Sequence, residues 1–370
     1  MTVLDDTLLG DPRALAALDT GGVLRSAATA GAQVRSAAHG AAEAGVGELA
    51  GTRPRSLVLL RRPGASGSAA ELLTALLAPV APIPVLTLDA IPGWIGPLDV
   101  VVAHTADRDD VVLAESVQLA VRRGAEVVLS APADGPVASA GAGRVRLVEP
   151  RIPVPPGLDL PRALAVGLAV AGVLDIAGAP VPAGLDPLAD QLDAEAERNQ
   201  PGHEPFMNPA KTLALRFDEH TPLLWGTDPL ATAVAGHAAA GLARHAGVVA
   251  HAADIGRASG AAGLVRALDR AAAGADIFRD PFDDDLNAAE HLPLRLVLLA
   301  TGEEDPVQVS LRSTGRGWPA ADVLHPVDEV PRGSAHAALL RAAVLASRLD
   351  VAAVYLGLAT RTIEPAGQEH

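Results

Sequence analysis

Short apolar runs of strand length alternate with helical stretches along the first 150 residues, and this alternation limits the chain to few folds. The runs lie at residues 55–60, 84–88, 98–103, 125–130 and 144–148. Helical patterns at residues 69–77 and 110–123 separate some of them. Parallel strands need crossover connections, and helices usually supply them, so this order predicts a parallel, doubly wound α/β sheet.

The same layout returns after a Pro-rich stretch and two further helical patterns, at residues 160–176 and 186–199. Strand candidates lie at residues 222–225, 294–300 and 322–327, and helical patterns at 230–246 and 334–358. A chain of 370 residues is long enough for two cores. We therefore expect a first α/β domain at residues 1–150, a linker with crossing helices at 151–215, and a second α/β domain at 216–370.

Composition excludes several classes of protein. The net charge is −15, so nucleic acid and anionic membranes are not expected partners. No run reaches the ~18 apolar residues of a membrane helix, and the first ten residues lack the pattern of a secretion signal, which predicts a cytoplasmic protein. The chain has no cysteine, which excludes disulfides and thiolate chemistry.

Two loops after predicted strands are candidate ligand-binding sites. The first contains Gly64, Ser66, Gly67 and Ser68 directly before a helix, where backbone N–H groups and hydroxyls can hold a phosphate. Gly and Ser are also the usual residues of a tight turn or a helix cap, so both interpretations stay open. The corresponding loop of the second domain begins with Gly226 and Thr227.

The second loop, residues 104–110, lies at the predicted carboxyl end of the sheet and offers the hydroxyl of Thr105. Its acidic residues Asp107, Asp109 and Asp110 would repel a phosphate unless Arg108 compensates, and an Asp before a helix is often only a cap.

Histidines and a carboxylate cluster are the remaining candidates for chemistry. His237 and His245 lie eight residues apart on one predicted helix, too far to share a small ion, and the acidic stretch at residues 280–285 fits no calcium loop. The phosphate-loop, nucleophile-elbow and zinc-protease motifs are absent. We therefore expect neither a metal nor a cofactor.

Several stretches together resemble the bifunctional phosphoglucose/phosphomannose isomerases, which carry two sugar isomerase (SIS) domains in one chain. They are residues 56–73, 98–132, 152–168 and 351–359, and the most specific is the motif NPAKTLA at residues 208–214. The resemblance implies two flavodoxin-like SIS domains with parallel sheets. It also implies aldose–ketose isomerisation, in which a carboxylate moves a proton between C1 and C2.

The residues that such chemistry needs are missing at the matching positions. Ala243 stands where the family has its catalytic Glu, residues 257–260 (RASG) replace the segment that carries its ring-opening His, and no Lys follows the last helix. Residues 104–110 (HTADRDD) stand where the family has its hydroxyl-rich loop for the sugar phosphate, and Thr105 is the only hydroxyl that remains there. We therefore expect an inactive isomerase relative.

Three hypotheses follow for the function. In the first, His237, His245 or His251 replaces the missing base and the chain is an isomerase. In the second, the chain binds a sugar phosphate in the cleft between the two domains without turning it over. In the third, it is a non-catalytic structural or regulatory partner of a sugar-metabolism enzyme. We also expect a homodimer that uses the apolar helices at residues 335–358 and 230–246.

Overall fold

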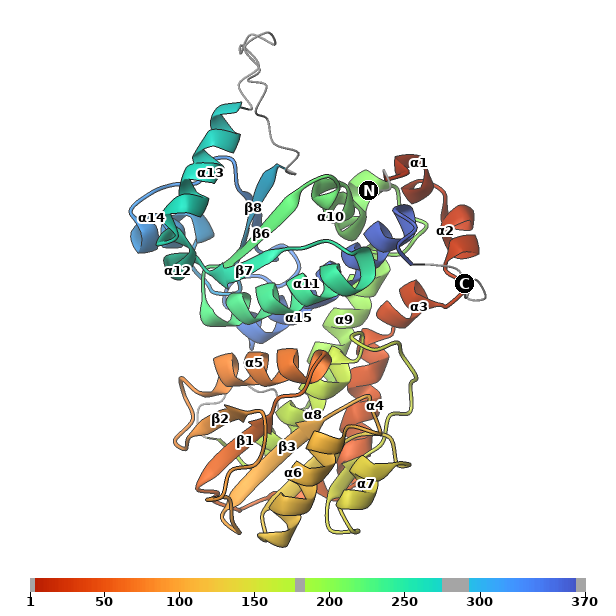
Figure 1. Ribbon diagram of the computed structural model, residues 1–370, viewed down its shortest axis with the longest axis vertical. Helices are drawn as coiled ribbons and strands as arrows, with labels where there is room; N and C mark the ends of the chain where they lie inside the picture. Colours follow the sequence, from red (N-terminus) through yellow and green to blue (C-terminus); the bar gives the residue numbers. More distant parts are fainter. Residues whose placement is uncertain (1–3, 177–183, 275–292, 364–370) are drawn as a thin grey trace. The chain divides into compact units, whose positions relative to one another are not determined.

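The computed structural model describes residues 4–176, 184–274 and 293–363 and divides the chain into two compact units. Residues 22–197 form the N-terminal unit, and residues 198–370 together with residues 1–21 form the C-terminal unit. Each unit contains one parallel sheet with helices around it, which confirms the predicted α/β fold (Figure 1). The division differs from the expected ranges, because the helices of residues 151–197 belong to the first sheet and the chain's first residues to the second.

The N-terminal unit is built around a five-stranded sheet with the order β2-β1-β3-β4-β5. Its strands are β1 (Ser56–Leu60), β2 (Val85–Leu88), β3 (Asp99–His104), β4 (Glu126–Ser130) and β5 (Arg146–Val148). Its helices are α3 (Val23–Ala27), α4 (Ala30–Glu43), η1 (Val46–Leu49), α5 (Ala65–Leu77), α6 (Val111–Arg122), α7 (Pro136–Ala140), α8 (Leu160–Val173) and α9 (Asp186–Arg198). All five strands were predicted from their apolar runs.

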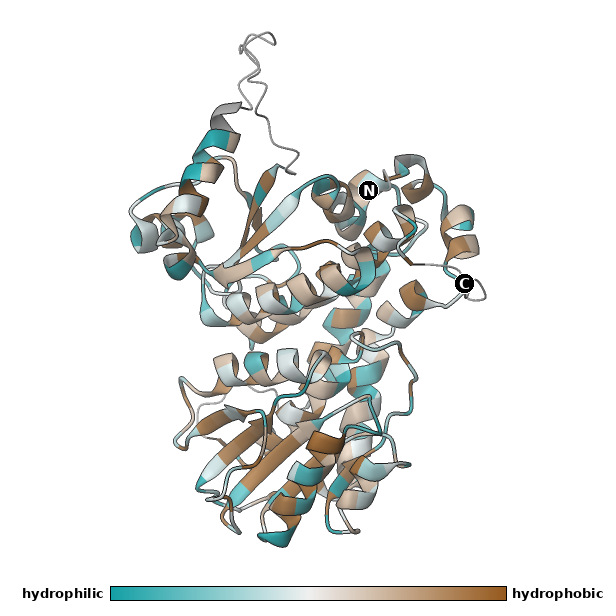
Figure 2. Cartoon of the chain, viewed as in Figure 1, coloured by the Kyte–Doolittle hydropathy of each residue, from teal (hydrophilic) through white to brown (hydrophobic). Residues whose placement is uncertain are grey.

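Both faces of this sheet are covered, which explains why its central strands are continuous apolar runs. Every residue of β1 and β3 is buried, and Figure 2 shows both strands as hydrophobic. Val58, Val101 and Val127 pack with the residues of α6 on one face. Gly167 of α8 allows α5 to pack closely against this helix, since a Cβ at position 167 would lie 2.2 Å from Leu73 Cδ1.

The C-terminal unit has a four-stranded parallel sheet with the order β7-β6-β8-β9. Its strands are β6 (Thr221–Gly226), β7 (His251–Asp254), β8 (Leu294–Leu299) and β9 (Asp322–Leu324). Its helices are α1 (Asp6–Leu9), α2 (Pro12–Leu18), η2 (Pro205–Met207), α10 (Pro209–Phe217), α11 (Pro229–Ala246), α12 (Ile255–Ser259), α13 (Ala262–Gly274), α14 (Pro306–Thr314) and α15 (Ala337–Ala359). Strand β7 was not predicted, because its sequence HAAD lacks β-branched and aromatic residues.

Helix α15 is the core helix of the C-terminal unit. Every one of its residues except Ala338 is buried, mainly against α10 and α11. It is long and apolar enough to cross a membrane, but a fully buried core helix passes the same test. Its faces are covered within the chain, so the expectation that this helix supplies a dimer surface is wrong. The homodimer itself stays a prediction.

Candidate functional site

The N-terminal sheet has a switch point between β1 and β3. The chain passes from β1 to β2 on one side, and β3 pairs with β1 on the other side. Open α/β sheets place ligands at the carboxyl ends of the strands at such a point, because the two loops there diverge and leave a crevice. In this sheet the expected place of such a crevice lies between residues 61–64 after β1 and residues 105–110 after β3.

An ion pair joins these two loops. Arg62 Nε donates to Asp110 Oδ2 at 2.7 Å, and Arg62 Nη2 donates to Asp110 Oδ1 at 3.0 Å. Burial raises the pKa of Asp110, but the Arg62 guanidinium and the Leu113 N–H outweigh it and lower that pKa below its ordinary value. Asp110 also caps α6 through the Leu113 N–H at 3.0 Å, so the capping interpretation of this residue is confirmed.

Arg62 was missed by the sequence reasoning, although it lies at the end of a predicted strand. A two-point pair between a guanidinium and a carboxylate has the geometry with which Arg also binds phosphate. The side chain of Arg62 is 18% exposed and that of Asp110 is 9% exposed. The ion pair therefore places a cation and an anion of the chain's own between the two loops.

The predicted Gly/Ser loop is in part the first turn of a helix. Helix α5 begins at Ala65, so Ser66, Gly67 and Ser68 are helical and only Gly64 remains in the loop, with φ of 86°. The Ser66 hydroxyl accepts from Arg62 N and donates to Leu60 O, both at 3.2 Å. Ser66 thus shapes the loop that carries Arg62.

Thr105 is likewise engaged within its own loop. Its hydroxyl accepts from the Asp107 N–H at 3.0 Å and donates to the Asp107 carbonyl at 3.2 Å. Its side chain is buried. The structure therefore places Thr105 at the crevice with a turn-forming role.

A buried polar cluster lies below this crevice, at the ends of β3 and β4. His104 Nδ1 lies 2.9 Å from Ser130 Oγ, and His104 Nε2 lies 2.7 Å from Asp159 Oδ2. Burial raises the pKa of Asp159, but His104 and Arg162 together lower it to about 2. Ser130 is completely buried, so this Ser–His–Asp arrangement ties β3, β4 and α8 together without access for a substrate.

The C-terminal sheet has its own switch point, between β6 and β8. There Asp228, the N-terminal cap of α11, binds the loop after β8. Its carboxylate accepts from Ala231 N at 2.8 Å, Thr301 N at 2.9 Å, Thr301 Oγ1 at 2.7 Å and Gly302 N at 3.3 Å. Gly226 and Thr227, the two candidate ligand-binding residues of this unit, lie next to Asp228. The Thr227 hydroxyl donates to Leu299 O at 3.1 Å. The other, Gly226, allows a close approach, because a Cβ there would lie 2.3 Å from Thr232 N.

The carbonyl side of the loop after β8 is held by Arg341 of α15, which is completely buried. Arg341 Nη1 donates to Thr301 O at 3.1 Å, to Gly302 O at 2.7 Å and to Glu303 Oε1 at 3.1 Å. His325 Nε2 lies 2.9 Å from the same Gly302 O, and burial together with Arg341 lowers the pKa of His325.

The three candidate histidines do not meet at this switch point. His237 Nε2 pairs with Asp350 Oδ1 at 2.9 Å between α11 and α15, and His245 is buried further along α11, where burial lowers its pKa. His251 begins β7, at the opposite edge of the sheet from the ligand loops, and accepts from Trp225 Nε1 at 3.2 Å. Among the described residues, no group of three His, Asp or Glu could hold a metal ion; residues 280–285 lie outside them.

The NPAKTLA motif has a structural role in the C-terminal unit. Asn208 caps α10 through the Lys211 N–H at 3.0 Å. The Lys211 ammonium is completely buried and donates to the carbonyls of Pro201 and His203, both at 2.8 Å, and lies 5.5 Å from the centre of the Tyr355 ring. Burial lowers the pKa of Lys211. The motif therefore fixes the loop before α10.

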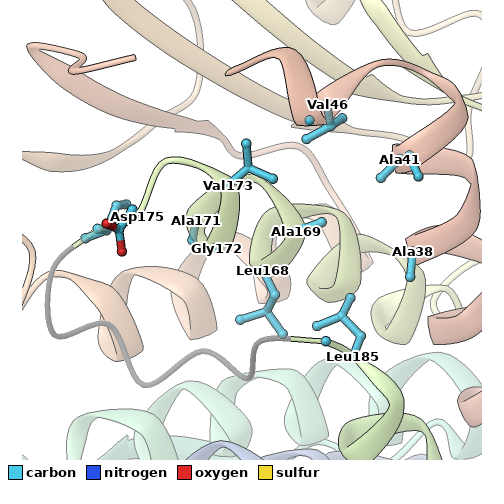
Figure 3. A pocket seen from close by; sticks show the side chains of 14 residues that line it. Ala38, Ala41, Val46, Leu168, Ala169, Ala171, Gly172, Val173, Asp175 and Leu185 are labelled. Carbon is cyan, nitrogen blue, oxygen red and sulfur yellow. The ribbon is translucent and has the colours of Figure 1, made fainter. Parts of the chain in front are cut away.

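A large hollow of the N-terminal unit lies elsewhere and has a different chemistry. It has a volume of about 630 Å³, and Ala38 and Ala41 of α4 line it together with Leu168 and Ala169 of α8 (Figure 3). Asp175 is the only charged residue among those that line it. An apolar hollow of this kind does not suit a phosphate, so the polar crevice between β1 and β3 is the better candidate site.

Comparisons with known proteins identify the fold. No protein-family model and no curated protein sequence matches the chain. Among solved structures, a provisionally assigned phosphosugar isomerase from Silicibacter pomeroyi is 16% identical, with a TM-score of 0.61 over 93% of this chain and 99% of that one. Tagatose-6-phosphate ketose/aldose isomerase from Escherichia coli is 9% identical, with a TM-score of 0.56 over 91% of this chain and 90% of that one.

A third similar structure is the C-terminal domain of glucosamine-fructose-6-phosphate aminotransferase from Francisella tularensis, 11% identical, with a TM-score of 0.55 over 93% of this chain and 95% of that one. The chain therefore has the two-sheet α/β fold of phosphosugar isomerases, the SIS fold. Identities this low define the fold alone.

Proposed function

We propose that this chain is a phosphosugar isomerase-like protein that binds a sugar phosphate at the crevice between β1 and β3 and does not isomerise it. The observation that carries the proposal is Arg62, a guanidinium held at the switch point and paired with a carboxylate from the opposite loop. A phosphate dianion can replace that carboxylate on the same two N–H groups. The resemblance to phosphoglucose/phosphomannose isomerases favours fructose, glucose and mannose 6-phosphates as ligands.

The absence of turnover is proposed from the groups that bound the crevice. Isomerisation needs a base that can reach both C1 and C2 of the sugar. Both ring nitrogens of His104 are already hydrogen-bonded, and its side chain is only 6% exposed. The carboxylate of Asp110 is engaged with Arg62 and the start of α6.

Thermal-shift titration with fructose 6-phosphate tests the binding. A ligand that binds the folded state raises the melting temperature as its concentration rises. We expect this rise in the wild-type chain and its loss in Arg62→Ala. Arg61→Ala is the matched control, since Arg61 pairs with Asp89 and Glu71 and lies outside the Arg62–Asp110 pair. A rise that persists in Arg62→Ala would overturn the proposed site.

A second candidate function, a non-catalytic partner of a sugar-metabolism enzyme, is favoured by the loop before α10. Phe206 is 80% exposed and Met207 is 66% exposed. The loop that presents them is fixed from inside by Asn208, Lys211 and Tyr355, so these apolar side chains need no rearrangement to contact a protein. Phe206→Ser would weaken such a complex in pull-down without changing the thermal shift by fructose 6-phosphate.

A further inference from the structure

The switch point of the C-terminal sheet already contains an anion, and that anion is the chain's own. The Asp228 carboxylate receives four hydrogen bonds, from one N–H at the start of α11 and from two N–H groups and one hydroxyl after the neighbouring strand. Donors that converge from a loop and a helix N-terminus are an arrangement with which proteins bind phosphate. An ordinary cap makes fewer bonds: Asp305 of α14 is exposed and holds only the Val307 N–H.

Positive charge also borders this loop, on its carbonyl side, where Arg341 Nη1 pairs with the Glu303 carboxylate at 3.1 Å. Arg341 is completely buried and, among the described residues, its Nη2 has no hydrogen-bond partner. Arg332 Nε donates to the Glu303 carbonyl at 3.0 Å on the same loop. Two guanidinium groups therefore border a loop whose N–H groups point at a carboxylate.

We infer that Asp228 substitutes for the anionic group of a ligand and closes the switch point of the C-terminal sheet to phosphate. If the proposed function holds, the chain then has one sugar-phosphate site, in the N-terminal unit, although it has two sheets of the same kind. The two switch points differ in one respect. In the N-terminal unit Asp110 pairs with a side chain, Arg62, which can exchange it for a ligand, whereas three of the four donors to Asp228 are backbone N–H groups.

The test removes the carboxylate and keeps a cap. Asp228→Ser retains a hydroxyl for the start of α11 but vacates the position between Thr301 and Gly302. Calorimetric titration with inorganic phosphate is expected to show saturable binding in Asp228→Ser, at least about tenfold tighter than in the wild type, the equivalent of about 1.4 kcal/mol. Asp305→Ser is the matched control, and no gain is expected there.

The same titration is repeated in an Arg62→Ala background. A gain in phosphate affinity that persists in this background belongs to the C-terminal unit. It would be observed even if the wild-type chain binds no sugar phosphate. Failure of the proposed function is therefore distinguished from failure of this inference. A folded Asp228→Ser variant that gains no phosphate binding overturns the inference. Wild-type chain that binds two equivalents of fructose 6-phosphate also overturns it, and this second measurement needs no variant.

Discussion

Arg62 and Asp110 are held together by two hydrogen bonds, of 2.7 and 3.0 Å, across the crevice where β1 and β3 end. The pair makes Asp110 a competitor of any anionic ligand for the same guanidinium. It also links the two loops of the candidate site directly. Binding at this crevice must therefore break one charge pair to form another.

Asp110→Asn tests this competition. The amide keeps an oxygen to cap α6 but loses the charge that holds Arg62, so we expect fructose 6-phosphate to bind several-fold more tightly. Calorimetric titration measures the change. Asp89→Asn, which releases Arg61 in the same way, is the control and should leave the affinity unchanged. Equal or weaker binding by Asp110→Asn would show that Arg62 is not the phosphate partner.

The buried pair of His104 and Asp159 predicts a specific dependence of stability on pH. The pKa of Asp159 is about 2 in the folded chain, against an ordinary value of 3.8. Because the folded value is the lower one, the stabilisation is complete above pH ~4 and is lost as the pH falls toward 2. It amounts to about 2 kcal/mol, and Asp159→Asn should cost about 3 kcal/mol at pH 7.

Urea unfolding of the wild type and Asp159→Asn at a series of pH values measures this difference. The gap between the two free energies of unfolding should shrink between pH 4 and pH 2. Asp134→Asn removes an exposed carboxylate that pairs with Arg108 and is the control. A gap that stays constant over this range would contradict the assignment of the low pKa to Asp159.

Lys211 and Tyr355 are the only lysine and the only tyrosine of the chain, and they lie against each other. The Tyr355 hydroxyl donates to Asn199 O at 2.7 Å, and burial raises the pKa of Tyr355. We expect Tyr355→Phe to cost about 1 kcal/mol of unfolding free energy. In alkaline titration, tyrosinate absorbance should appear only together with loss of helix by circular dichroism. Tyrosinate in the folded protein would contradict the burial and hydrogen bonding of the Tyr355 hydroxyl.

The sequence predicts the strands better than it predicts the site. Apolar runs such as Ser56–Leu60 mark strands that are buried on both faces, and periodicity locates helices such as Pro229–Ala246. The site depends on pairs that are far apart in sequence. Nothing local indicates that Arg62 meets Asp110, or that Asp228 meets Thr301, because these contacts arise only when neighbouring strands place their loops side by side.

Local patterns also mislead where helix and loop residues are alike. Glycine and serine are common in loops, so Gly67 and Ser68 predict a loop, yet both lie in the first turn of the Ala-rich helix α5. His237 and His245 are candidate catalytic residues because histidine often acts as an acid or a base in enzymes. In the structure both are buried on α11, where His237 pairs with Asp350. Ala243, which stands where the resembling family has its catalytic glutamate, bears on turnover, and the absence of turnover stays a prediction.

Proton exchange at the sugar is the most direct test of binding without isomerisation. Wild-type chain is incubated with saturating fructose 6-phosphate in D₂O, and deuterium at C1 is followed by NMR, because even an incomplete isomerase exchanges that proton through its base. We expect saturable binding that Arg62→Ala abolishes and no deuterium above the protein-free control. Deuterium at C1, or formation of glucose 6-phosphate or mannose 6-phosphate, would contradict it and show that the chain is an active isomerase.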